Sequence, residues 1–121
     1  MKTFGSLRIL EQGMEIVAAA HQLVGKYTQA NMADLIKEIN LLAIGIPSSI
    51  AATSKQEAPN AYHEGLKLAL SLVQRIAEKL SYFNVNEPAL ERLKCLMHLE
   101  HQLIEQALGK SDRIIMKKPA K

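Results

Sequence analysis

Apolar residues recur every three or four positions in four successive blocks of this chain, which is the spacing that places them on one face of an α-helix. We expect these helices at about residues 5–27, 31–52, 54–82 and 86–109. Pro59 and Pro88 fall in the first turns of the third and fourth blocks, where a missing amide N–H costs nothing. Because long amphipathic helices with short connections pack side by side, the pattern predicts an all-α, antiparallel up-down-up-down four-helix bundle.

The first block has the widest apolar face. One line of helical spacing runs through Leu10, Met14, Val17, His21 and Val24. A second line widens this face to about half of the circumference and consists of Ile9, Gly13, Ile16, Ala20, Leu23 and Tyr27. A face of this width predicts contact with two neighbouring helices.

Residues 110–121 differ from the rest of the chain in charge. They contain five basic residues and one acid, a net charge of +4, whereas the whole chain carries +3 and the other residues sum to −1. We therefore expect a bundle over residues 1–109 and a basic C-terminal tail over residues 110–121. The tail either solubilises the chain or binds nucleic-acid phosphates without reading sequence, through Lys110, Arg113, Lys117, Lys118 and Lys121.

Cysteine content and hydropathy bear on the compartment. Cys95 is the one cysteine in the chain, so no intramolecular disulfide can form. The first residues lack the apolar core of a signal peptide, and no stretch approaches the roughly 18 uninterrupted apolar residues of a membrane span. These observations predict a cytoplasmic protein without a membrane partner.

The segment 41–52 is apolar on nearly every side of its predicted helix. Ile46 and Ile50 continue the inward stripe of the second block, while Leu41 and Ile44 project from other sides. Pro47 cannot donate a hydrogen bond to the carbonyl of the residue four positions earlier, so we expect a kink that Ser48 or Ser49 relieves. One small bundle has more apolar surface here than it can bury, which predicts self-association through Leu41, Ile44, Ile46, Pro47 and Ile50.

Residues 45–51, Gly-Ile-Pro-Ser-Ser-Ile-Ala, resemble a known motif. The motif is Ser-Ile-Pro-x-Asn-Ile-Ala-Glu-Gly, at the end of the second helix of four-helix-bundle proteins encoded within intervening sequences of bacterial large-subunit rRNA genes. Residues 14–17 and 21–24 also resemble the first helix of that family. The chain departs from the motif at Ser49, Ala52 and Thr53, where the family has Asn, Glu and Gly.

The resemblance implies a homo-oligomeric bundle, with pentameric rings among the relatives. It also implies kinship with the accessory variability determinant of diversity-generating retroelements, a basic pentameric bundle that binds a reverse transcriptase and nucleic acid. We therefore expect a non-enzymatic, ring-forming protein that binds RNA, DNA or a ribonucleoprotein weakly through its basic tails. The alternative is a protein-only adaptor, such as an accessory protein of a reverse transcriptase.

Glu100 falls in the middle of the inward stripe of the fourth block, where an isolated carboxylate is costly. His21 lies on the apolar side of the first block, and antiparallel first and fourth helices would bring the two together. The pattern predicts a buried polar pair, His21 with Glu100, that fixes the register of the helices. A position at a rim or a subunit interface is the alternative, and a catalytic acid is the least expected role.

His98, His101 and Glu105 share one helical face, at a spacing that a metal site could use. Di-iron bundles need a Glu-x-x-His motif on two helices and two further carboxylates, and the sequence supplies no such set. We expect a solvated polar face and no metal or other cofactor. The chain also lacks a Gly-rich phosphate loop and a nucleophile motif, so we predict no catalytic residues and no enzymatic activity.

Overall fold

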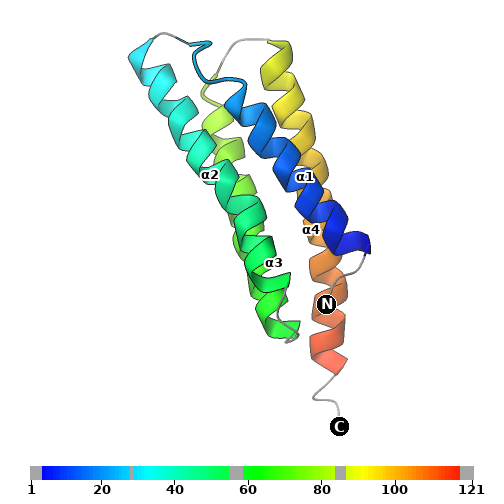
Figure 1. Cartoon of the computed structure of the whole chain (residues 1–121). Helices are drawn as coiled ribbons and strands as arrows, with labels where there is room; N and C mark the ends of the chain where they lie inside the picture. Colours follow the sequence, from blue (N-terminus) through cyan, green and yellow to red (C-terminus); the bar gives the residue numbers. More distant parts are fainter. Residues whose placement is uncertain (1–3, 28, 55–58, 84–86, 118–121) are drawn as a thin grey trace.

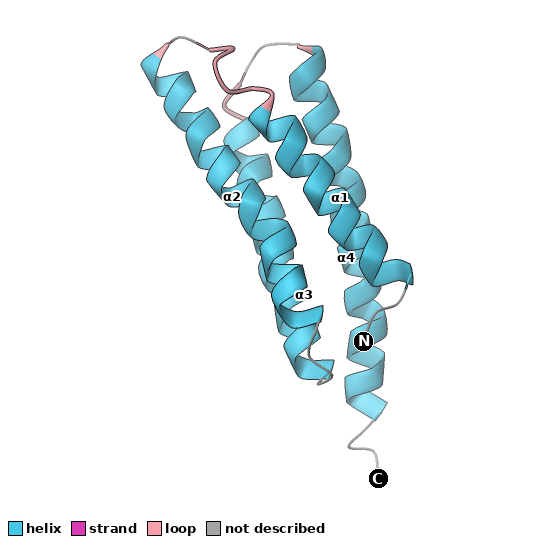
Figure 2. Ribbon diagram, viewed as in Figure 1, coloured by secondary structure: helices cyan, strands magenta, loops and turns pink. Residues whose placement is uncertain are grey.

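The computed structural model describes the backbone of residues 4–27, 29–54, 59–83 and 87–117, and the side chains of 7–27, 29–52, 61–83 and 87–109. The regular elements are α1 (Phe4–His21), α2 (Ala30–Ser54), α3 (Pro59–Leu80) and α4 (Pro88–Lys117). No strand occurs within these ranges (Figure 2). The all-α, four-helix architecture expected from the sequence is confirmed.

Each helix packs against two others. α2 contacts α1 and α3, and α4 contacts α3 and α1, so that the four helices surround one core (Figure 1). The pairing of α2 with α3 is the most extensive, and the pairing of α1 with α4 is the least extensive. Bulky aliphatic side chains from all four helices fill the core, among them Ile16, Ile39, Ile76, Leu93 and Ile104.

The inward face of α1 differs from the expected one. Ile9, Ile16, Ala20 and Leu23 are buried, as the second line of apolar positions requires. The first line turns away from the core: Met14 and Val24 are largely exposed, and His21 is exposed as well. The core therefore uses one half of the wide apolar face and leaves much of the other half in solvent.

α1 ends at His21, six residues before the predicted end at Tyr27. The chain leaves the helix through tight turns, in which the Leu23 amide donates to the Ala20 carbonyl at 3.1 Å. Gly25 has a φ of 88°, a left-handed conformation that glycine adopts at little cost. The ring of Tyr27 then packs against the ring of Phe83, with centroids 5.3 Å apart, and this contact closes the end of the bundle.

α2 continues through Pro47 to Ser54. The Ser48 hydroxyl donates to the Ile44 carbonyl at 2.9 Å and the Ser49 hydroxyl to the Gly45 carbonyl at 2.7 Å. Pro47 has no amide N–H to donate to the Ala43 carbonyl, and Ile44 and Gly45 are the two residues after Ala43. The serine hydroxyls therefore bond back to the helix, but to the Ile44 and Gly45 carbonyls and not to the Ala43 carbonyl that Pro47 frees, so the predicted acceptor was wrong.

α2 is also the most apolar of the four helices. Its window Ala30–Ala52, 23 residues with a mean hydropathy of 1.4, is long and apolar enough by length and composition to cross a membrane. The core helix of a soluble protein passes the same test.

α4 is the longest helix, with 30 residues, and it extends past the ends of its neighbours (Figure 1). The predicted end near Gly109 was wrong, because the helix continues for eight more residues to Lys117. Glycine costs a helix interior only about 1 kcal/mol, so Gly109 does not stop a helix without a left-handed turn. Pro88 lies in the first turn of α4, as predicted, and is its first residue.

Candidate functional site

The outer flanks of α1 and α2 carry the most conspicuous exposed apolar side chains. On α1, Gln12 and Glu15 face α4, so the opposite flank of α1 faces α2. On α2, Asn40 bonds the Ala20 carbonyl of α1, and Ile44 follows it by four residues on the same flank. We call the resulting surface the α1–α2 face; it consists of Leu7, Leu10, Met14, Val17, Leu41 and Ile44.

Exposure on the α1–α2 face is high for side chains of this size. Leu41 is 72% exposed, Met14 58% and Ile44 51%. Leu10 and Val17 are partly buried and pack against the core below them. An exposed apolar surface formed by two neighbouring helices is typical of a protein–protein contact.

The residues predicted for oligomerisation divide into two groups. Leu41 and Ile44 belong to the α1–α2 face. Ile46 and Ile50 are at most 1% exposed, so the prediction that they contact a second copy was wrong: the chain's own core already covers them. Pro47 is half-buried, and its Cδ approaches Gly13 of α1.

Met14 and Leu7 belong to the α1–α2 face but were not predicted as contact residues. Periodicity alone cannot tell which half of a wide apolar face turns inward. Gly13 is the signal that could have decided this, because close approach of two neighbouring helices needs a small residue on the inward side.

Glu100 lies in the centre of the bundle with 0% of its surface exposed. Among the described residues it is the one buried side chain that is polar or charged. Neither Oε1 nor Oε2 has a hydrogen-bond partner. Burial raises the pKa of the Glu100 carboxyl from 4.5 to about 8, so the group is mainly neutral at pH 7.

The predicted pairing of Glu100 with His21 was wrong. His21 is exposed at the end of α1, and the Glu100 carboxyl instead faces Gly13, where a Cβ atom would lie 3.2 Å from Oε2. The two α1 positions are eight residues apart, about 12 Å along the helix, which is too far for one side chain to bridge. The predicted burial of Glu100 is confirmed.

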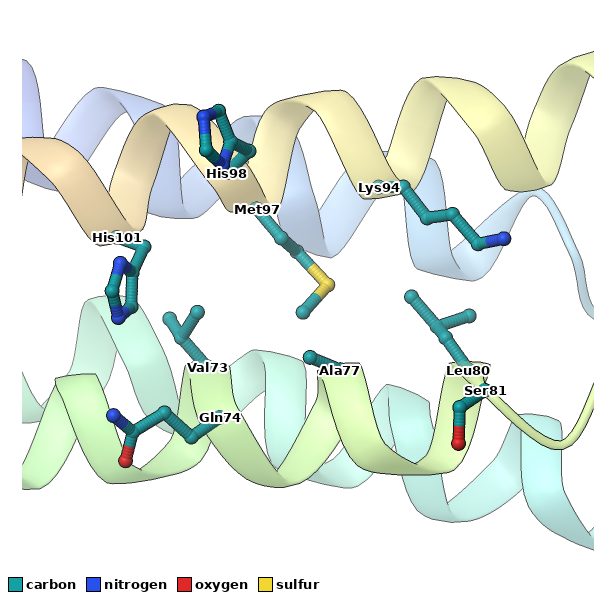
Figure 3. Close-up of a pocket in the computed structure, with 9 residues that line it drawn as sticks. All are labelled: Val73, Gln74, Ala77, Leu80, Ser81, Lys94, Met97, His98 and His101. Carbon is teal, nitrogen blue, oxygen red and sulfur yellow. The ribbon is translucent and has the colours of Figure 1, made fainter.

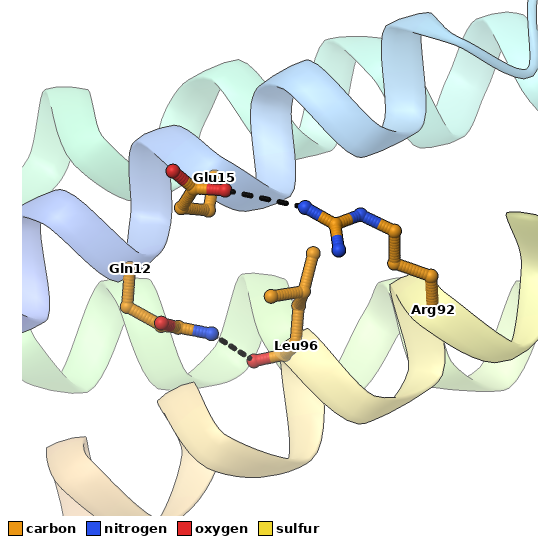
Figure 4. A network of polar contacts seen from close by, with 4 residues as sticks. All are labelled: Gln12, Glu15, Arg92 and Leu96. Atoms are coloured by element: carbon orange, nitrogen blue, oxygen red, sulfur yellow. Dashed lines mark hydrogen bonds and ion pairs between the residues drawn. The ribbon is translucent and has the colours of Figure 1, made fainter.

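Polar side chains connect α1 to α4 (Figure 4). Gln12 Nε2 donates to the Leu96 carbonyl of α4 at 2.9 Å, and Glu15 Oε1 lies 3.5 Å from Arg92 Nη2. The Glu15–Arg92 pair is exposed, and such pairs contribute at most about 1 kcal/mol. Gln12 is the more constraining contact because it is partly buried and crosses the interface.

A shallow groove of about 480 Å³ runs between α3 and α4 (Figure 3). Apolar side chains form much of its lining, and its ionisable residues are Lys94, His98 and His101. Lys94 Nζ is 3.8 Å from Glu91, and His101 Nδ1 is 3.7 Å from Glu105 on the same helix. In the part of the chain that the structure describes, no group of three or more His, Cys, Asp or Glu residues could hold a metal ion, and Cys95 is exposed.

The basic residues predicted to bind nucleic acid lie at the end of α4. The backbone at Lys110, Arg113 and Lys117 is helical, and the side chains of these residues lie outside the described ones. Lys118 and Lys121 lie outside the described residues altogether. Comparison of the chain with protein-family models, with curated proteins and with solved structures finds no match, so the resemblance to the rRNA intervening-sequence proteins stays a prediction.

Proposed function

We propose that this protein is a non-enzymatic assembly module, an up-down-up-down four-helix bundle whose copies associate through the α1–α2 face. The observation that carries the proposal is the exposure of Leu41, Ile44 and Met14 on two neighbouring helices. Fully burying a leucine, isoleucine or methionine side chain contributes roughly 1.5–3 kcal/mol. In an isolated bundle these side chains stay in contact with water. Association of copies buries several of them on each chain and so lowers the free energy.

The order of contacts along the helices supports the up-down-up-down arrangement. Gly13 approaches Pro47, whereas Ala20, later in α1, approaches Asn40, earlier in α2. Between α1 and α4 the contacts run Gln12 to Leu96 and Glu15 to Arg92, again in reverse order. Contacts of this order are those of antiparallel neighbours.

A second copy of the chain is the occupant that the composition of the face favours. The six side chains that define the α1–α2 face are apolar, and apolar side chains are the ones that form the core of an oligomer interface. Closed assemblies of identical chains bury such a face completely, whether the symmetry is that of a dimer or of a pentameric ring. Self-association also gathers the basic ends of several chains, which strengthens their summed field.

Within this assembly, we propose that the basic end of α4 binds nucleic acid or a ribonucleoprotein. Residues 110–121 carry a net charge of +4, and α4 holds the first part of this segment on a helix that projects beyond the bundle. Binding to phosphates without base contacts is weak and weakens steeply as salt rises.

Sedimentation or light scattering of the whole chain tests self-association. Leu41→Glu with Ile44→Glu is expected to reduce the assembly to a monomer, because burying two carboxylates in an apolar interface is costly. Leu68→Glu is the matched control, since Leu68 is 53% exposed on α3, outside the α1–α2 face. A wild-type monomer, or equal dissociation in the control, contradicts the proposal.

Fluorescence anisotropy with labelled RNA and DNA at about 50 mM salt tests the basic end. Lys110→Gln, Arg113→Gln and Lys117→Gln together are expected to weaken binding and to flatten its salt dependence. Lys26→Gln, Lys67→Gln and Arg75→Gln remove the same charge from exposed positions elsewhere and serve as the control. An assembly that binds neither RNA nor DNA favours the protein-only adaptor instead.

A further inference from the structure

Glu100 is a buried acid that takes part neither in the proposed self-association nor in the proposed nucleic-acid binding. Its carboxyl lies where α1, α2 and α4 meet: Glu100 Oε2, Ile46 and Pro47 all lie within 3.5 Å of the point where a Cβ atom of Gly13 would be. Gly13 itself has no side chain that could donate a hydrogen bond. Among the described residues, neither oxygen of the Glu100 carboxyl has a hydrogen-bond partner.

The other elements around Glu100 are equally apolar towards the core. α3 contributes Leu66, Ala69 and Val73 among its buried residues, and no buried residue of the described chain other than Glu100 is titratable. The ionisable groups nearest in sequence on α4 are His98, which is exposed, and His101, whose Nδ1 lies 3.7 Å from the exposed Glu105. Lys94, six residues before Glu100, pairs with Glu91. Across the interface, Glu15 of α1 pairs with Arg92 at the surface.

A carboxylate formed at this place has no hydrogen-bond partner among the described residues and no exposed surface. An unpaired charge in an apolar interior is far more costly than the neutral acid, so the group must keep its proton or reach solvent. Glu100 lies directly against Gly13 of α1, and the α1–α4 pairing is the least extensive of the four, so a movement of α1 away from α4 is the one that exposes the carboxyl.

We propose that Glu100 is a proton-operated latch between α4 and α1. While the carboxyl is neutral, α1 packs closed over it through Gly13. When the proton is lost, α1 loosens from α4 and admits water to the carboxylate, while α2 and α3 stay packed. The device depends on the fold of one chain and holds whether or not copies associate.

The acidity of the group places this transition between weakly acidic and mildly alkaline solution. Burial raises the pKa of Glu100 in the closed form to about 8, whereas the ordinary value of an exposed glutamate is 4.5. Between these two values opening is linked to the loss of one proton, so each pH unit multiplies the ratio of open to closed chains about tenfold. Above about pH 8 the carboxyl is ionised in both forms, and the ratio levels off.

Amide hydrogen exchange tests the latch, with the rates corrected for the intrinsic dependence of exchange on pH. In the wild-type chain, protection of residues 9–20 of α1 is expected to fall about tenfold between pH 6 and pH 7, with residues 66–80 of α3 unchanged. Glu100→Gln keeps the shape of the side chain without its proton equilibrium and is expected to abolish this fall. Glu105→Gln, an exposed acid on the same helix, is expected to behave like the wild type.

If the protection of α1 falls with pH in Glu100→Gln as much as in the wild type, the latch is overturned. The latch is also overturned if protection falls equally in α1 and α3. If the Glu100→Gln variant does not fold, an NMR titration of the Glu100 carboxyl carbon in the wild-type chain tests the latch instead. A titration midpoint for Glu100 well above 4.5 supports the latch, and a midpoint near 4.5 overturns it.

Discussion

Gly13 of α1 leaves the space that the Glu100 carboxyl of α4 occupies: a Cβ atom on the glycine would lie 3.2 Å from Oε2 and 3.2 Å from Ile46 Cγ2. Both distances are shorter than nearly all carbon contacts in folded proteins. The close approach of α1 to α4 and the burial of Glu100 therefore both depend on Gly13. Single substitutions test each of these features separately.

Gly13→Ala is expected to destabilise the chain by about 1–2 kcal/mol, because overpacking at two rigid contacts outweighs the gain in helix propensity. Thermal and denaturant unfolding measure the change. Gly109→Ala is the matched control: it also lies inside a helix, and an added Cβ there meets no atom within 4 Å. We expect that variant to be more stable by about 0.5–1 kcal/mol, and stabilisation by both substitutions would contradict the tight crossing.

Glu100 also predicts a pH dependence of the free energy of unfolding. The pKa of this acid is raised in the folded state, so its contribution is fully present below the unfolded value of 4.5 and is lost as pH rises towards about 8. The difference between the wild type and Glu100→Gln is expected to change by about 1.4 kcal/mol per pH unit in this window. Denaturant titrations from pH 5 to pH 8 measure it, and a difference independent of pH is the contrary result.

Asn40 predicts a polar contribution to the α1–α2 contact. Its Nδ2 donates to the Ala20 carbonyl at 3.1 Å and to the Ile36 carbonyl at 3.0 Å. Asn40→Ala removes both bonds and is expected to cost about 1–2 kcal/mol, because the carbonyls are partly shielded from water. Asn31→Ala, at an exposed position that bonds only the next amide, is expected to cost less than about 0.5 kcal/mol. Equal costs for the two variants would refute the assigned role.

The turn after α1 is expected to be sensitive to substitution of Gly25. Because its φ is 88°, Gly25→Ala is expected to destabilise the chain by about 1 kcal/mol, although no atom lies near enough to clash. Gly25→Asn is expected to cost less, since asparagine tolerates the left-handed region better than alanine does. Thermal unfolding distinguishes the two, and a stabilising alanine at this position would contradict the left-handed turn.

Periodicity predicted the number and order of the helices because a core must be lined by residues that share one face. It also predicted correctly that Ile46 and Ile50 of α2 and Glu100 of α4 point inward. It failed on α1, where the apolar face is wider than the contact. Only the close approach of Gly13 to its neighbours decides which half turns inward.

The candidate site was also predicted only in part. The sequence indicated that Glu100 is buried and that Leu41 and Ile44 project outward, because each follows from position on a single helix. It could not pair Glu100 with a residue of another helix, because that depends on the axial offset between α1 and α4. The error in pairing His21 with Glu100 is an error of two helical turns in that offset.

The length of α4 has a mechanical consequence. Glu100 and Lys110 lie on one uninterrupted helix, ten residues or about 15 Å apart. A helix transmits rotation and translation along its axis as a stiff rod, so α4 cannot shift at Glu100 without carrying its basic end through the same motion. Any shift of α4 that accompanies a change in packing around Glu100 therefore also moves the basic segment that begins at Lys110.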